Sequence, residues 1–169
     1  MNLDYADDLR SVTERAAHEL LRLSPERAAE RPAPGKWSIK EIVGHLIDSA
    51  SNNHQRFVRA QWTPDLVFPG YDQDEWVASQ RYADAPWPEL VVLWREFNLH
   101  LARFMAMIPL HDRERPRVTH NLDQIAFTPV PLDQPATLDY FMRDYVEHLK
   151  HHLRQISELT QRLTPTKTI

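Results

Sequence analysis

The amino-acid sequence predicts an all-α protein, a four-helix bundle with crossover connections. Apolar residues recur at three- and four-residue intervals in four tracts of about 20 residues each, which is the period of an amphipathic helix. Thirteen prolines against three glycines gather between these tracts and separate them. Two of the connecting segments are long, as expected of a bundle whose connections cross over.

The first two tracts have clear boundaries. The first carries its apolar stripe from Leu9 to Leu23 and should end before Pro25. The second opens with Ser38 and Glu41 in the order S-x-x-E, a capping box in which each side chain binds the other residue's free backbone N–H. Its stripe should continue to about residue 62, before the next proline.

The third tract covers residues 86 to 108 and is closed by Pro109. The fourth begins near Thr137, a suitable N-cap, and should end before Pro165. Between them, residues 110 to 136 contain two short pieces, VTHNL and IAFTPV, that predict either a short extended hairpin or an irregular flap. The chain has no internal repeat and no linker, so we expect residues 1–169 to form a single domain.

Composition narrows the function classes. A formal net charge of -4 and a pI near 6.1 provide no basic surface for a phosphate backbone, which argues against nucleic-acid binding and favours a small-molecule substrate. No apolar run approaches the roughly 20 residues of a membrane span, and the N-terminus does not resemble a signal peptide. We therefore expect a cytoplasmic protein without membrane contact. Because cysteine is absent, any metal ligands must be nitrogen or oxygen atoms.

A short apolar segment after the second tract bears on the oligomeric state. Trp62, Val67 and Phe68 lie where exposed apolar side chains would favour a homodimer contact. Packing on the end of the bundle explains them equally well.

Three histidines are the strongest chemical signal. His148 and His152 lie one turn apart on one face of the fourth tract, and His152 falls within its apolar arc. His45 flanks the apolar stripe of the second tract, and Ser49, Asn52 and Arg56 continue along the same flank. Three imidazoles could therefore converge from two helices into one buried metal site. Two histidines four residues apart also occur often as ordinary surface or core residues.

The chain resembles the DinB-like superfamily, and within it the YfiT-like branch that includes bacillithiol S-transferases. The resemblance rests on KWSIKEIVGHLIDS, SNNHQRF, PGYDQDEW and the final H-x-x-x-H, which together cover most of residues 36 to 160. It implies a bundle in which His45, His148 and His152 bind one divalent metal ion, Zn²⁺ or Ni²⁺. It also implies an activity on a low-molecular-weight thiol such as bacillithiol or mycothiol. Residues 110 to 136 depart from these relatives and could shape the mouth of a substrate site.

Three imidazole ligands leave a fourth position on the metal open, the pattern of a catalytic site. In the favoured hypothesis the metal holds a cofactor thiolate that attacks an electrophilic small molecule, and Asn52 and Arg56 place the polar groups of the thiol. The alternatives are a hydrolase that uses metal-bound hydroxide and a non-catalytic bundle that binds metal or a small molecule. No carboxylate in the sequence is placed well enough to serve as the base of a hydrolase, which favours thiol transfer.

Overall fold

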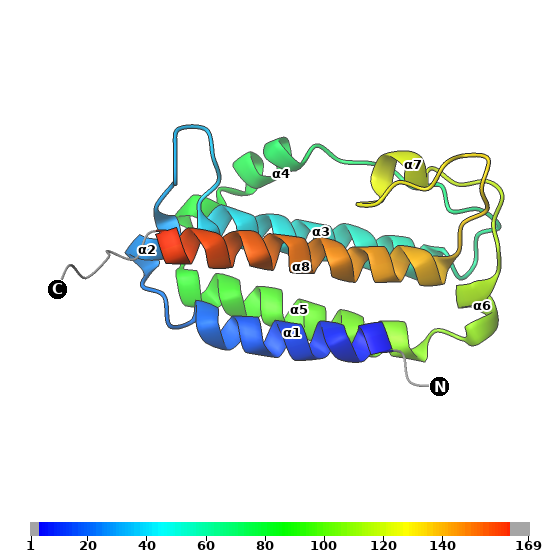
Figure 1. Cartoon of the computed structure of the whole chain (residues 1–169), viewed down its shortest axis with the longest axis horizontal. Coiled ribbons are helices and arrows are strands. Elements are labelled where there is room, and N and C mark those ends of the chain that lie inside the picture. The colour runs from blue at the N-terminus through cyan, green and yellow to red at the C-terminus, as the bar shows by residue number, and fades with distance from the viewer. Residues whose placement is uncertain (1–3, 163–169) are drawn as a thin grey trace.

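The computed structural model describes residues 4–162, and four long helices account for most of them (Figure 1). These are α1 (Asp4–Leu20), α3 (Ile39–Arg59), α5 (Trp87–Met107) and α8 (Leu138–Arg162). Helix α1 packs on α5 and α8, and α3 packs on the same two helices, so α1 and α3 lie diagonally opposite each other. The predicted four-helix bundle is confirmed.

The helix boundaries follow from local chemistry. Ser38 Oγ accepts from the backbone N–H of Glu41 at 3.3 Å, while the Glu41 carboxylate accepts from the N–H of Ser38 at 2.9 Å, so the predicted capping box is present. Thr137 Oγ1 accepts from the N–H of Tyr140 and caps α8. Helix α1 ends at Leu20, and a short helix α2 (Pro25–Ala29) follows, capped by Ser24. The expected stop of the last helix before Pro165 lies outside the described residues.

Helices α3 and α5 run in the same direction, so residues 60–86 must return along the bundle to connect them (Figure 1). This crossover contains α4 (Gln73–Gln80) and a short 3₁₀ helix η1 (Tyr82–Asp84). Several polar contacts fix it to α3, and two of them lie at its η1 end. The Tyr82 hydroxyl donates to Asp48 Oδ1 at 2.6 Å, and Lys40 Nζ donates to the Ala83 carbonyl at 2.7 Å.

Gly44 allows the crossover to approach α3 closely. A Cβ atom at this position would lie 2.1 Å from Cδ2 of Tyr82. We expect Gly44→Ala to displace the Tyr82 ring and to lower the free energy of unfolding by about 1 to 3 kcal/mol, the usual cost of overpacking. Denaturant titration would measure it. Gly70→Ala is the control, because its Cβ would meet only Ile125 at 3.9 Å and should change stability by less than about 0.5 kcal/mol. Equal stability of the two variants would contradict the close contact.

Residues 108–137 form two short helices, α6 (Leu110–Glu114) and α7 (Leu122–Ile125), rather than an extended hairpin. Within the described residues no strand forms, and the expected hairpin is reduced to one antiparallel pair in which Arg117 and Ala136 exchange backbone hydrogen bonds of 2.8 and 2.9 Å. Pro116 and Pro135 precede these two residues, and a proline has no N–H with which to extend a ladder. The segment is held in place by the Arg117 side chain, which donates to the backbone carbonyls of residues 60, 112 and 115.

The apolar residues after α3 have two different environments. Trp62 and Val67 are exposed, with 78% and 53% of their surfaces accessible, whereas Phe68 is buried and its ring stacks on Phe141 of α8. Phe68 therefore packs on the bundle and is not available to a partner. Between Asp4 and Arg162, no helix combines the length and the apolar character that crossing a bilayer requires.

Candidate metal centre

Three histidine side chains meet between α3 and α8. The Nε2 atom of His148 lies 3.4 Å from Nε2 of His45 and 3.1 Å from Nε2 of His152. One nitrogen from each ring falls within 4.8 Å of the other two, and this is the one group of three or more metal-ligating side chains among the described residues. The structure therefore brings together the three histidines that the sequence singled out.

The two helices hold these rings in different ways. His148 and His152 are one turn apart on α8, which places their rings side by side with centroids 4.6 Å apart. His45 is almost fully buried on α3, where Trp37 covers its ring at a centroid distance of 5.1 Å. Phe127 lies against His148 at 5.4 Å. Aromatic side chains therefore shield the imidazoles on two sides.

Burial keeps the three imidazoles neutral. Removal from water and, to a smaller extent, the neighbouring histidines lower the pKa of His45 and of His148 to about 3, because two adjacent imidazolium ions would repel each other. The pKa of His152 is lowered mainly by burial as well. At neutral pH each ring therefore carries one proton and one free lone pair, which is the form that binds metal ions.

The hydrogen-bond partners indicate where those lone pairs point. Gln155 places its amide oxygen 2.9 Å from Nδ1 of His152, so Nδ1 donates its proton there and Nε2 keeps the lone pair. Ser49 Oγ lies 3.4 Å from Nδ1 of His148 and can accept the proton of that ring in the same way. Lone pairs from at least two rings then converge on one point, where they repel each other unless a cation lies between them.

The group fits a divalent metal ion. Three nitrogen donors are a common ligand set for zinc, nickel and related ions, and a proton held on Nδ1 by a neighbouring side chain is the usual way in which a ligating histidine is oriented. The buried Nδ1 atom of His45 has no hydrogen-bond partner within residues 4–162. His45 is therefore the one ligand that no neighbouring polar side chain orients. Packing against Trp37 takes that role.

A cavity of about 530 Å³ opens beside the histidines. Its walls come from α3, α8, the first part of the crossover and the segment around α7, and they include His45 and His148 themselves. The other side chains that matter to its chemistry are the following: Ser49, Asn53, Arg56, Tyr71, Asp72, Asp74, Phe127, Asp144 and Tyr145. A small molecule in this cavity would reach the histidine group directly.

The two residues predicted to bind the thiol have different positions. Arg56 is buried and lines the cavity, whereas Asn52 does not line it, and its amide donates to the carbonyl of Asp48 at 2.9 Å. Asp48 itself is buried beneath the crossover, where it accepts from Gln80 and Tyr82 rather than from His45. Asp144 accepts from the backbone N–H groups of Phe127 and Thr128, both at 2.7 Å, and so fixes one cavity wall.

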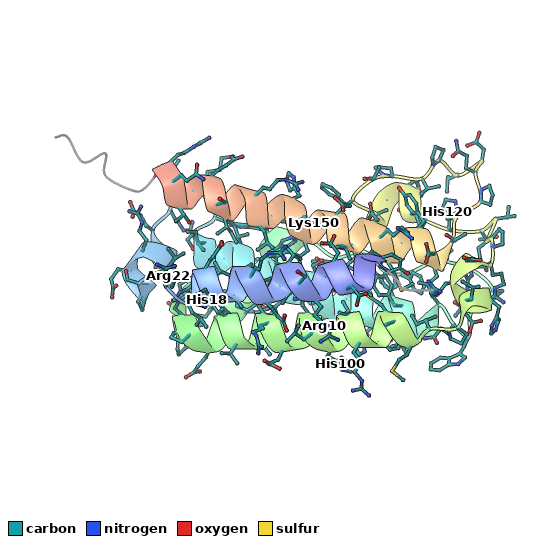
Figure 2. All side chains as sticks on the ribbon, turned by 60° about the horizontal axis from the view of Figure 1, so that its bottom comes forward. Arg10, His18, Arg22, His100, His120 and Lys150 are labelled. Atoms are coloured by element: carbon teal, nitrogen blue, oxygen red, sulfur yellow. The ribbon has the colours of Figure 1, made fainter. Side chains whose placement is uncertain are left out.

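Of the remaining histidines, His151 contacts the ring of His152 without joining the group, and the others lie apart from it. His18 on α1 and His100 on α5 are exposed (Figure 2), and His100 contacts the ring of His54 at 5.3 Å. His120, also labelled there, is buried in the segment after α6 and donates to the carbonyl of Gln134 at 2.7 Å. That bond gives His120 a structural role in holding the segment together.

Sequence reasoning overlooked Tyr71, Asp74 and Phe127, which line the cavity from outside the long helices. Phe127 follows α7, in a segment where no periodic pattern indicates which side chains turn inward. Tyr71 and Asp74 fall within PGYDQDEW, so the family resemblance was the only signal that pointed to them.

The fold and the histidine group together place this chain in one class of protein. Its members are helical bundles with a candidate metal centre between two facing helices. The chain belongs to the DinB superfamily, whose sequence model matches residues 8–156. Within that superfamily it is similar to YfiT of Bacillus subtilis (strain 168), with 28% identity over 132 residues, or 76% of this chain and 67% of YfiT. YfiT is provisionally named a metal-dependent hydrolase.

Two further comparisons, one with a second relative and one with a solved structure, also point to YfiT-like proteins. A second relative, OB0413 of Oceanobacillus iheyensis, also provisionally named a metal-dependent hydrolase, is 26% identical over 73 residues. That match covers 43% of this chain and less than half, 42%, of the relative. The solved structure of Bacillus subtilis YfiT, described as having an unusual four-helix bundle topology, superposes with a TM-score of 0.73 at 19% identity. It covers 96% of this chain and 90% of YfiT, so the two proteins share a fold.

Proposed function

We propose that this protein is a metal-dependent enzyme that activates a low-molecular-weight thiol for transfer to an electrophilic small molecule. His45, His148 and His152 would hold one divalent ion, Zn²⁺ or Ni²⁺, through their Nε2 atoms. One observation carries the proposal: the three nitrogen atoms converge, and two of the histidines, His45 and His148, line a cavity of about 530 Å³, so a bound ion would lie beside a space large enough for a substrate. A purely structural metal would be enclosed by protein ligands on all sides.

When bound, the ion would lower the pKa of a thiol in its open position and so supply a thiolate near neutral pH. The protein provides the surroundings. Trp37 and Phe127 limit the access of water to the imidazoles, and Ser49 and Gln155 hold the protons of His148 and His152 on the side away from the ion. Polar side chains deeper in the cavity can bind the rest of the thiol.

Two of the three carboxylates that line the cavity, Asp72 and Asp144, already accept hydrogen bonds, and this favours transfer over hydrolysis. A hydrolase needs a carboxylate that is free to take a proton from water. Both oxygens of Asp144 are occupied by backbone N–H groups, and Asp72 caps α4 by accepting from the backbone N–H of Glu75 at 2.9 Å. A thiol that loses its proton at the metal needs no such base.

Hydrolysis is the second candidate, and two observations support it. The relatives YfiT and OB0413 are both named for that activity. Asp74 also lines the cavity near its mouth, and its carboxylate forms neither a hydrogen bond nor an ion pair with the described residues. It is therefore the residue that would act as base for a water molecule at the same site.

One assay separates the two reactions. The zinc-loaded protein is mixed with a thiol and monobromobimane, and thiol loss is followed over time across cysteine, glutathione, bacillithiol and mycothiol. Transfer predicts metal-dependent loss that exceeds the uncatalysed rate at least tenfold for one of the thiols and disappears in His148→Ala. Hydrolysis predicts turnover of 4-nitrophenyl esters without thiol, and loss of that turnover in Asp74→Asn. Thiol loss at the uncatalysed rate with all four compounds would overturn the transfer proposal.

A further inference from the structure

Arg56 is a buried cation without an anionic partner. Only 6% of its surface is accessible, and its guanidinium donates to the carbonyl of Pro69 at 2.8 Å and to Oδ1 of Asn53 at 3.4 Å. In the described part of the chain no carboxylate lies within ion-pair distance of it. The ring of Tyr71 lies 5.9 Å from the centre of the guanidinium and offers only a weak cation–π contact.

Keeping such a charge buried is unfavourable for the folded protein. Burial lowers the pKa of Arg56 below its ordinary value, and the one group that acts in the opposite direction is Tyr71 rather than an acidic side chain. Buried charges are normally paired, and an apolar side chain of similar size would stabilise the bundle at least as well. The described residues leave the charge of Arg56 without an anion, which suggests that its anionic partner is a ligand.

The guanidinium faces the same cavity as the histidines. Arg56 follows His45 by eleven residues, and at about 100° per residue it returns to within about 20° of the same direction on α3. Its side chain reaches back to Asn53, one turn closer to His45, so the guanidinium lies roughly 10 to 12 Å along the helix axis from that histidine. His45, Ser49, Asn53 and Arg56 all line the cavity between these two ends.

The acidic residues of the cavity do not satisfy this charge. Asp144 is occupied by backbone N–H groups, and Asp72 and Asp74 are exposed at the mouth, where water and salt screen them. Two of the five N–H donors of Arg56 are used by Asn53 and Pro69. The remaining donors can bind a carboxylate, the anion whose geometry matches a guanidinium edge.

We propose that the substrate of this site carries a carboxylate roughly 10 Å from the atom that it presents to the metal, and that Arg56 binds this carboxylate. The inference rests on the proposed metal-dependent function and names the class of substrate. It makes Arg56 a specificity residue: it selects for the charged end of the substrate while the histidines hold the ion at the reacting end.

The test compares acids with their uncharged esters. Zinc-loaded protein is titrated calorimetrically with 8-mercaptooctanoic acid and with suberic acid monohydroxamate, which span the distance with a thiol or a hydroxamate at the metal end, and with the methyl ester of each. We expect each acid to bind about 10- to 100-fold more tightly than its ester, as for a charge-assisted hydrogen-bonded pair. In Arg56→Met the ratio should fall to near one while zinc content is unchanged. Arg56→Lys should retain part of it.

Arg59→Met is the matched control, because Arg59 is exposed on the same helix and its substitution removes the same charge. Its acid-to-ester ratio should equal that of the parent. Equal affinity for acid and ester in the parent, a preference that persists in Arg56→Met, or no binding of any of the four compounds would overturn the inference. Failure of the two thiols alone, with the hydroxamates still preferring the acid form, would overturn thiol activation and leave the role of Arg56 standing.

Discussion

Replacement of His148 by alanine is expected to abolish stable metal binding. Its Nε2 atom lies 3.4 Å from that of His45 and 3.1 Å from that of His152, so its loss leaves only two of the three nitrogen donors. Altering a residue that only supports a ligating histidine commonly weakens metal binding 10- to 100-fold, and removing the ligand itself should weaken it by at least about 100-fold. The parent should retain close to one equivalent of zinc or nickel after dialysis, and the variant almost none.

Elemental analysis of untagged protein measures this directly, and circular dichroism checks that the variant is folded. His151→Ala is the control, because His151 is exposed on the same helix and its ring contacts that of His152 at 5.2 Å without belonging to the group. It should retain the metal. A full equivalent in His148→Ala, or equal loss in both variants, would show that the three histidines do not form the site.

The parts of this site that lie on long helices could be predicted from the sequence, because helical spacing determines which residues share a face. The Ser38 capping box fixed where α3 begins, and the one-turn spacing of His148 and His152 placed both rings together. His45 faces His148 and His152 only because α3 packs beside α8. Periodicity alone does not contain that information, and here it came from the family resemblance.

Helical angles are a poor guide where a segment distant in sequence covers a helix. Asp48 has the angle of a solvent-facing residue on α3, yet it is buried, because the crossover brings Gln80 and Tyr82 over it. Viewed down the axis of α3, Asn52 and Arg56 each lie about 20° from the direction of His45, one on either side of it. Only Arg56 lies on the side that faces the cavity. A helical pattern cannot tell these two sides apart until the packing of α3 against its neighbours is known.

The second large effect should come from Asp144, which ties a cavity wall to α8. Asp144→Ala would remove the acceptor of two hydrogen bonds of 2.7 Å to Phe127 and Thr128, and we expect the free energy of unfolding to fall by about 2 to 4 kcal/mol. Glu147→Ala, on an exposed part of the same helix, should change it by less than about 0.5 kcal/mol. Denaturant titration measures both variants, and equal stability would contradict this role.

Asp144→Ala also tests whether the metal site and the cavity wall contribute independently to activity. Metal content should remain near one equivalent in Asp144→Ala, because none of the three histidines bonds to this carboxylate. Residues 124–128 should exchange their amide hydrogens faster, since they lose their anchor. Phe127 would then cover His148 less completely, and water would reach the reacting atoms. Retained metal with a reduced rate of thiol transfer would show that catalysis needs the closed wall as well as the ion. Loss of metal would show instead that Asp144 supports the histidines through the fold.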